Sequence, residues 1–279
     1  MLAYLKIIRL GNCALASTGV IVGAIIAEGI GVFSQTEILQ MFFASLVVFF
    51  STAGGNVLND YTDRDVDRIN HPERAIPSGE IKPEHALIYS LVLFALGFFF
   101  ALISRYWFVL TTILVLAIGL MVAYEFRFKA EGFSGNVIIS FLTALVFIFG
   151  GAAFGNPLLT VPFAVVSFLG SLYREIVKDI EDIAGDVNRH TLPKKVGIRN
   201  AGKIAIASLV AGIGFSILPL FLPDFGFYPK IAYALGIGLA NIVFIYSATF
   251  TFKSPTKSQK IAKMGMFIAT ISFLLIGLR

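Results

Sequence analysis

The sequence has little of what soluble proteins use to build their sites. It contains one cysteine and three histidines in 279 residues, and charged residues make up only 14% of the chain. The lone Cys13 excludes an intrachain disulfide framework and a cysteine-based zinc or iron–sulfur site, and the histidines are too dispersed for a metal triad. Hydrophobic residues reach 57%, which with so little charge excludes a soluble globular protein of this size. The composition therefore predicts an integral membrane protein.

The sparse charges separate long uncharged runs. A bilayer core takes about 20 apolar residues per helix, and an ionisable group within it is costly. Six runs have 18 to 22 residues each, at positions 10–27, 38–59, 85–104, 106–124, 204–223 and 231–252. Run 132–173 is long enough for two helices separated by Gly155-Asn156-Pro157, a turn signal, and run 264–278 is extended if Lys260 and Lys263 snorkel. We predict an all-α fold of nine membrane-spanning helices in one domain, residues 1–279.

The positive charges are distributed unevenly over the two predicted sides. The N-terminus and the loops after the second, fourth, sixth and eighth spans hold 19 of the 22 Lys and Arg residues and 14 of the 17 acids. The positive-inside rule makes that side cytoplasmic. The sequence pI of about 9.3 therefore reflects topology. It favours anionic ligands and lipid headgroups as partners, and not nucleic acid.

Two cytoplasmic segments carry oxygen side chains in helical register. Asn59, Asp63 and Asp67, the first acidic stripe, are spaced i, i+4 and i+8 after the second span. Glu175, Asp179, Asp182 and Asp186, the second acidic stripe, continue the sixth span at i, i+4, i+7 and i+11. Each set occupies one helix face, where like charges repel. An even number of spans separates the two stripes, so both lie on the same side and are expected to share a cavity.

These stripes are suited to a hard cation together with phosphate. Carboxylate and amide oxygens bind Mg²⁺, which prefers one or two carboxylates plus substrate phosphates. Basic residues near the stripes would meet the remaining phosphate oxygens. A Phe-rich cavity would house an allylic chain and shield its cation. The candidate substrate-binding residues are Asn56, Asp60, Arg64, Arg68, Arg74, Arg174, Lys178, Lys194 and Lys195.

These features also have interpretations other than the magnesium–diphosphate site. A cytoplasmic charge run is usually a solvated loop, but two runs with matched register at helix ends are not typical of one. A cation-coupled transporter also clusters acids, although it usually places them near the bilayer midplane on interrupted helices. The glycine pairs Gly54-Gly55 and Gly150-Gly151 indicate close helix packing and not ligand approach.

The two segments resemble signatures of the UbiA superfamily of intramembrane prenyltransferases. NDYTDRDVDRINHPERAIPSG at 59–79, the first signature, is similar to the first aspartate-rich signature of that superfamily, and KDIEDIAGDVNRHTLPKKVG at 178–197, the second signature, to the second. The resemblance implies nine helices around a central cavity and Mg²⁺-dependent transfer of a prenyl group from its diphosphate. It assigns magnesium and diphosphate to Asn59, Asp63 and Asp67, and to two of Asp179, Asp182 and Asp186, with Asp63, Asp67, Asp182 and Asp186 as the catalytic set.

Within the superfamily, the residues of the two signatures are most similar to those of the archaeal ether-lipid branch. That branch is implied to join geranylgeranyl diphosphate to the free hydroxyl of geranylgeranylglyceryl phosphate. A phosphorylated acceptor suits the basic loop after the sixth span, and we expect Lys178, Lys194 and Lys195 to serve it. Enzymes that prenylate aromatic quinone precursors use much the same signatures, so that acceptor class remains the alternative.

Overall fold

The computed structural model describes residues 2–183 and 190–279 and folds them into a bundle of helices. In this part of the chain nine helices are long and apolar enough to cross a membrane, as the sequence predicts, and no strand is present. The break between the fifth and sixth spans falls at the expected Gly-Asn-Pro turn. The nine are α2 (Leu10–Glu28), α3 (Gln35–Asn70), α4 (Pro83–Leu102), α5 (Trp107–Phe126), α6 (Phe133–Ala152), α7 (Pro157–Asp182), α9 (Ile198–Phe215), α10 (Phe227–Ala248) and α11 (Pro255–Gly277).

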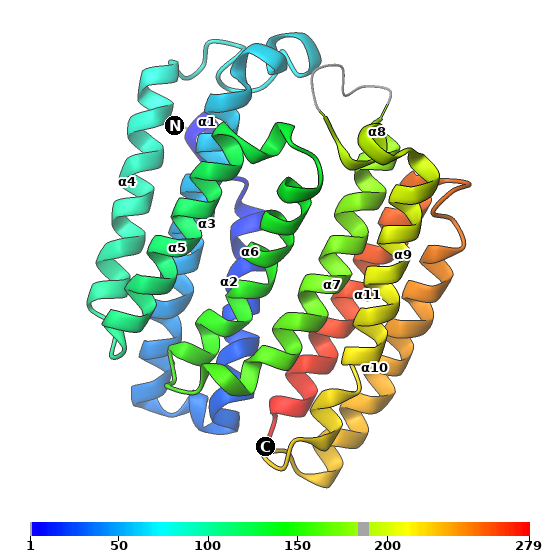
Figure 1. Ribbon diagram of the computed structural model, residues 1–279. Helices are drawn as coiled ribbons and strands as arrows, with labels where there is room; N and C mark the ends of the chain where they lie inside the picture. Colours follow the sequence, from blue (N-terminus) through cyan, green and yellow to red (C-terminus); the bar gives the residue numbers. More distant parts are fainter. Residues whose placement is uncertain (1, 184–189) are drawn as a thin grey trace.

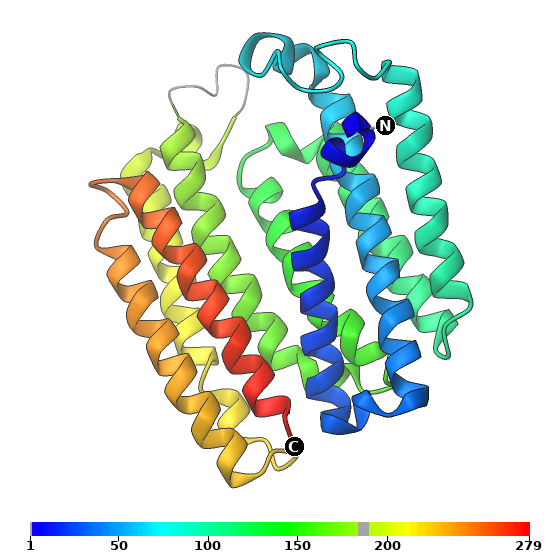
Figure 2. The same ribbon diagram turned by 180° about the vertical axis from the view of Figure 1, so that it is seen from behind.

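The helices run up and down the bundle, so that alternate connections lie at the same end. Figure 1 shows the C-terminal ends of α3 and α7 at the top, with the N-terminus, whereas the C-terminus lies at the bottom. The view from behind shows the same arrangement (Figure 2). Helix α2 packs against α3, α6 and α11, and α7 packs against α6, α9 and α11. Both signatures therefore start from one end of the bundle, as the even number of intervening spans requires.

Two helices extend well beyond the length needed for a bilayer. α3 has 36 residues and carries the first acidic stripe as continuous helix. α7 has 26 residues and ends at Asp182 within the second stripe. α11 begins at Pro255, where a proline is tolerated in the first helical turn, so Lys260 and Lys263 lie in its first turns as expected.

Several short elements were not predicted from the sequence. They have too few residues to show a helical period, and packing fixes them. They are the helices α1 (Leu2–Ile7) and α8 (Leu192–Val196) and the 3₁₀ turns η1 (Gly29–Phe33), η2 (Phe128–Ala130) and η3 (Leu218–Phe221).

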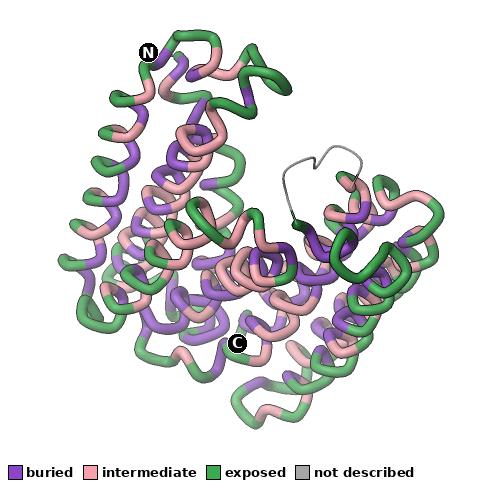
Figure 3. Tube along the Cα trace, turned by 45° about the horizontal axis from the view of Figure 1, so that its top comes forward, coloured by how far each residue is buried: buried purple, intermediate pink, exposed green. Residues whose placement is uncertain are grey.

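The glycine pairs permit close helix contacts, as predicted. A Cβ built on Gly150 would overlap the carbonyl oxygen of Val20, so α6 and α2 approach backbone to backbone. A Cβ on Gly54 would lie 2.8 Å from the Phe94 ring, which packs α4 against α3. Buried residues follow the inner faces of the helices and exposed residues the outer faces (Figure 3).

A buried polar cluster fixes the signature end of α7. The Tyr173 hydroxyl lies 2.8 Å from Ser258 Oγ, 3.0 Å from Ser247 Oγ and 3.1 Å from Thr251 Oγ1. These contacts join α7 to α10, α11 and the turn between them. Because unpaired hydroxyl groups in an apolar interior are costly, the cluster holds α7 in one position relative to that hairpin, six residues before Asp179.

Candidate active site

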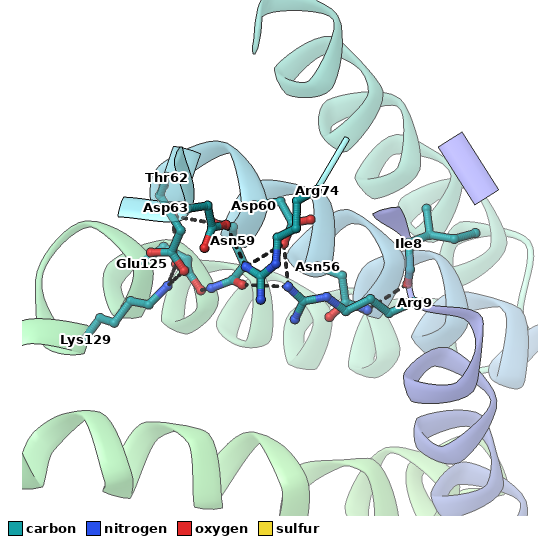
Figure 4. A network of polar contacts seen from close by, with 11 residues as sticks. Ile8, Arg9, Asn56, Asn59, Asp60, Thr62, Asp63, Arg74, Glu125 and Lys129 are labelled. Atoms are coloured by element: carbon teal, nitrogen blue, oxygen red, sulfur yellow. Dashed lines mark hydrogen bonds and ion pairs between the residues drawn. The ribbon is translucent and has the colours of Figure 1, made fainter. Parts of the chain in front are cut away.

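The C-terminal part of α3 directs its polar side chains to two different neighbours. Asn59 contacts Glu125 at the end of α5, and Asp63 contacts Lys129 in the turn η2 that follows α5, whereas Asp60 contacts Arg9 of the N-terminal segment (Figure 4). Asp67 contacts Arg74 in the loop after α3. The first acidic stripe is therefore helical, as predicted, but its three members do not share one environment.

The α5 side is a network of five polar side chains, in which Glu125 contacts three and Lys129 extends the network to Asp63. Glu125 Oε1 accepts a hydrogen bond from Asn59 Nδ2 at 2.9 Å, and Oε2 accepts one from Thr62 Oγ1 at 2.9 Å. Lys129 Nζ donates to Glu125 Oε2 at 2.8 Å and to Asp63 Oδ2 at 2.7 Å. The side chains of Glu125 and Lys129 are only 8% and 12% exposed. Screening by water is therefore weaker here than at an exposed ion pair, and Lys129 holds a positive charge beside Asp63.

The opposite side is built from two arginines and two buried aspartates. Arg9 forms an ion pair with Asp60, and its Nη2 lies 3.3 Å from Asn59 Oδ1. Arg74 Nη1 lies 2.6 Å from Asp67 Oδ2 and 3.9 Å from Asp60 Oδ1. Asp60 and Asp67 are 6% and 4% exposed. Buried carboxylates need such partners, because removing one partner leaves an uncompensated charge. The arginines thereby fix this end of α3.

Ile8 and Arg9 form the joint between α1 and α2, and the backbone of this joint places the Arg9 side chain beside Asp60. Arg9 has φ 52°, the only positive φ of a non-glycine residue in the described part of the chain. For a side chain other than Gly, Asn or Asp this conformation costs on the order of 1 kcal/mol. Asn56 fastens the joint from α3 by donating from Nδ2 to the Ile8 carbonyl at 2.8 Å. The predicted substrate-binding residue Asn56 therefore faces the joint.

The second acidic stripe is described only in part. Asp179 Oδ2 accepts a hydrogen bond from Asn136 Nδ2 on α6 at 3.0 Å. Arg174 pairs with Glu175, which removes Glu175 from the acids that remain accessible. Asp182 is exposed at the end of α7, and Lys178 is exposed on the same helix. Asp186 lies outside the described residues.

The turn η2 connects the two signatures. Lys129, within η2, contacts Asp63 of the first signature. Directly after it, the Glu131 carbonyl accepts a hydrogen bond from Lys195 Nζ at 2.9 Å, and the Ala130 carbonyl accepts one from the His190 amide at 2.9 Å. Residues 190–195 of the second signature are thus held against the same turn that supplies Lys129.

The remaining predicted basic residues lie at the surface. Arg64 donates to the Tyr61 carbonyl at 2.8 Å and stacks over the Tyr61 ring. Arg68 is 65% exposed in its side chain and pairs only with Asp65 among the contacts described. Lys194 is exposed on α8. None of these three is gathered into the groups formed around Glu125 and Asp60.

An apolar cavity lies next to the Glu125 network. It is formed by α3, α5 and α6, and Met121 in its wall is one helical turn before Glu125. Thr52 lies two turns before Asn59 on α3. The lining residues are Val48, Ser51, Thr52, Ile113, Leu114, Ala117, Met121, Leu142, Leu145, Val146 and Phe149.

Comparison with known proteins identifies the chain. Residues 17–271 match the UbiA prenyltransferase family. The chain belongs to this family. The digeranylgeranylglyceryl phosphate synthase of Methanosphaera stadtmanae is 37% identical over 97% of both chains, and that of Thermococcus kodakarensis is 33% identical over 99% of this chain and 98% of its own.

Solved structures agree with this assignment. A structure from work on digeranylgeranylglyceryl phosphate synthase in membranes is 35% identical, covers 99% of this chain and 98% of its own, and superposes with a TM-score of 0.83. A UbiA homologue from Archaeoglobus fulgidus bound to GPP and Mg²⁺ is 15% identical with a TM-score of 0.70, over 97% of this chain and 99% of its own. The second likeness shows the UbiA fold alone.

The donor set suits magnesium held jointly with a substrate. Among the described residues no three His, Cys, Asp or Glu side chains gather into a metal site of their own. The accessible oxygens instead belong to two helix ends, Asn59 and Asp63 on α3 and Asp179 and Asp182 on α7. Such a divided set of hard ligands fits Mg²⁺, which takes few carboxylates and completes its shell with phosphates and water.

Four residues of this candidate site were not found from the sequence. They are Arg9, Glu125, Lys129 and Asn136, and none lies in either signature. One signal was present: Glu125 and Lys129 are spaced i, i+4 at the end of the fourth span, on the signature side of the membrane. Arg9 and Asn136 carried no such signal, because only packing brings α2 and α6 beside the signatures.

Proposed function

We propose that this protein transfers a geranylgeranyl group from its diphosphate to the free hydroxyl of geranylgeranylglyceryl phosphate, with Mg²⁺ as cofactor. The observation that carries the proposal is the paired Lys129 and Asp63 beside an apolar cavity at the end of the bundle where both signatures lie. The acceptor follows from relatives named digeranylgeranylglyceryl phosphate synthase, 33–37% identical over nearly the full length.

The reaction exchanges one carbon–oxygen bond for another. The bond between the allylic carbon and the donor diphosphate breaks, and diphosphate leaves with the electron pair. The acceptor hydroxyl oxygen forms a new ether bond to the same carbon, and the hydroxyl proton is released. An aliphatic hydroxyl is a weak nucleophile at neutral pH, so ionisation of the donor leads and a closely held hydroxyl captures the allylic cation.

The residues have distinct roles in this proposal. Lys129 meets the diphosphate, and Glu125 orients Lys129 and Asn59. Asn59, Asp63, Asp179 and Asp182 would hold Mg²⁺, which would neutralise charge on the departing diphosphate. Asp67, which the sequence pattern assigned to the metal, is instead buried and paired with Arg74. The cavity between α3, α5 and α6 takes the prenyl chain and excludes water from the cation. Arg74 positions Asp67.

The proposal extends to the whole chain and its orientation. Residues 1–279 form one prenyltransferase domain, which the family match over 17–271 supports. The signature end of the bundle faces the cytoplasm, because that end carries most of the Lys and Arg residues. Geranylgeranyl diphosphate and the acceptor then enter from the cytoplasmic leaflet.

Product analysis tests the proposal. The purified protein in detergent receives geranylgeranyl diphosphate, Mg²⁺ and geranylgeranylglyceryl phosphate, and mass spectrometry should detect the doubly geranylgeranylated ether and released diphosphate. Chelation of Mg²⁺ should stop both. Prenylation of an aromatic acid in place of the glyceryl phosphate would assign the protein to the quinone branch, and ion flux in sealed vesicles without prenyl transfer would make it a transporter.

A further inference from the structure

A second cavity lies beside Asp60, on the side away from Lys129. Its volume is about 270 Å³, enough for several water molecules or a small polar group. The N-terminal segment forms one wall and the loop after α3 forms the other. The lining residues are Lys6, Ile7, Arg9, Asp60, Glu73, Arg74, Ala75 and Glu80.

The cavity presents unused hydrogen-bond donors. A guanidinium has five N–H donors, yet in the described part of the chain the Arg9 contacts use only Nη2 and the Arg74 contacts use only Nη1. The side chains of Arg9 and Arg74 are 35% and 31% exposed, so their remaining donors are accessible. Lys6 is exposed and has no described partner. The guanidinium groups of Arg9 and Arg74 and the ammonium group of Lys6 together form the kind of donor arrangement that binds phosphate.

The acids of the cavity fall into two groups. Asp60 is buried and paired with both arginines, so it does not oppose an anion. Glu73 and Glu80 are exposed at the rim, and Glu73 lies 3.4 Å from His71 Nδ1. An anion in the cavity would therefore be attracted by Lys6 and repelled by Glu80, which gives the two residues effects of opposite sign.

The position of the cavity suits a lipid acceptor whose polar head must lie close to the prenyl diphosphate. Arg9 lines the cavity and also contacts Asn59, which on its other side donates to Glu125, the hydrogen-bond partner of Lys129 (Figure 4). A neutral amide thus separates the two places where anions would sit. Leu2 and Leu5 on α1 are exposed, so an apolar tail can leave the cavity along α1 into the membrane.

We propose that this cavity binds the phosphate of the lipid acceptor, the glycerol phosphate head lying between Lys6, Arg9 and Arg74 and the tail along α1. The inference rests on the proposed function and assigns the acceptor phosphate here in place of Lys178, Lys194 and Lys195. Lys195 is already engaged with the Glu131 carbonyl.

Steady-state kinetics with each substrate varied in turn tests the assignment. Lys6→Gln should raise the acceptor KM about three- to five-fold, the effect of one partly exposed charge, and leave the donor KM within two-fold. Glu80→Gln should lower the acceptor KM. Lys82→Gln, an exposed lysine outside the cavity, is the matched control and should change neither constant. An unchanged acceptor KM in Lys6→Gln, or a rise only in Lys178→Gln or in a Lys194→Gln/Lys195→Gln double variant, overturns the proposal.

The lipid composition of the bilayer distinguishes the acceptor phosphate from a phospholipid headgroup as the group bound in the cavity. The Lys6→Gln effect should persist in nanodiscs of neutral phosphatidylcholine. An effect seen only with added anionic phospholipid would mean that a bilayer headgroup occupies the cavity, contrary to the proposal.

A binding measurement separates this inference from the proposed function. Ala75→Cys in a Cys13→Ala background places one thiol in the cavity. Geranylgeranylglyceryl phosphate should slow its reaction with maleimide, whereas geranylgeranylglycerol, which has no phosphate, should not. Wild-type protein without prenyl transfer would refute the function and leave this test intact, and absence of protection in an active enzyme would refute the cavity assignment.

Discussion

Asp63 and Asp65 are two residues apart, yet the structure gives them different surroundings. Asp63 contacts Lys129 at 2.7 Å, whereas Asp65 is 68% exposed in its side chain and pairs only with Arg68 among the described contacts. We predict that Asp63→Ala lowers kcat at least 100-fold without loss of folding, and that Asp65→Ala changes it less than about three-fold, the value of an exposed pair. Prenyl transfer and thermal unfolding in detergent measure the two effects. Equal losses at 63 and 65 would contradict the helical register.

Asp67 differs from Asp63 in burial, which the sequence did not indicate. The spacing predicts an exposed metal ligand, but Asp67 is 4% exposed and holds Arg74 at 2.6 Å. Asp67→Ala leaves Arg74 without this partner. Because this ion pair anchors the end of α3 that carries Asn59 and Asp63, the substitution should lower kcat and also reduce the free energy of unfolding by about 2 kcal/mol. A normal unfolding temperature in Asp67→Ala would show that the ion pair does not stabilise this end of α3.

Glu125 is the residue through which α5 acts on the first signature. Its carboxylate accepts from Asn59, Thr62 and Lys129. Glu125→Gln keeps the shape but removes the charge that orients Lys129, so we expect kcat/KM for the donor to fall about 10- to 100-fold, the range of one strong charged hydrogen bond. Donor-varied kinetics measure this, with Glu131→Gln, whose side chain contacts Arg127 only among the described pairs, as the control. A fall of similar size in the control would make the effect one of general surface charge.

At the scale of elements, the contact between α2 and α6 sets the position of Arg9. Gly150 lies against the backbone of α2, where a Cβ would overlap the Val20 carbonyl. Gly150→Leu must separate the helices, and we expect a loss of about 1 to 3 kcal/mol, typical of overpacking. Gly119→Ala on α5 has nothing within 4 Å of the added carbon and should be neutral or slightly stabilising. Thermal unfolding of both variants measures the difference.

Helix α5 forms one wall of the apolar cavity, with α3 and α6 forming the others. Ala117 lines it two helical turns before Glu125, so a larger side chain there would shorten the space for the prenyl chain. Ala117→Phe should lower kcat/KM for geranylgeranyl diphosphate more than for geranyl diphosphate, by about ten-fold for the steric cost of one misfitted segment. Competition between the two donors, with products separated by mass, gives the ratio. An unchanged ratio would remove this cavity from donor binding.

At the scale of the whole molecule, the alternating helices predict which loops share a side. Cys13 is the natural cysteine of the chain and is buried. Replacing it in a Cys13→Ala background leaves only the introduced cysteine to be labelled. Ser78→Cys after α3 and Asn200→Cys at the start of α9 should react with a membrane-impermeant maleimide only from the cytoplasmic side. Ser34→Cys before α3 should react only from the opposite side. Labelling of positions 78 and 200 from opposite sides would remove the shared site.

The sequence by itself determined the number of spans and the end at which the site forms. Charges at membrane depth are costly, so the gaps between charges give helices, and the Lys and Arg count predicts which end of the bundle faces the cytoplasm. The spacing of Asn59, Asp63 and Asp67 fixed a helix there because period 3.6 places them on one face. These are local properties of the chain, readable without its neighbours.

Only the tertiary structure decided which charges meet. Arg9 and Asp60 are 51 residues apart, and Lys129 and Asp63 are 66 apart. Such pairs depend on which helices pack side by side, and glycine contacts such as Gly150 with α2 settle that. Burial then separates residues of one pattern, so that Asp67 is an anchored carboxylate and Asp63 an accessible one. The sequence shows the type and spacing of groups, but the free energy of each group depends on partners and solvent access that folding alone supplies.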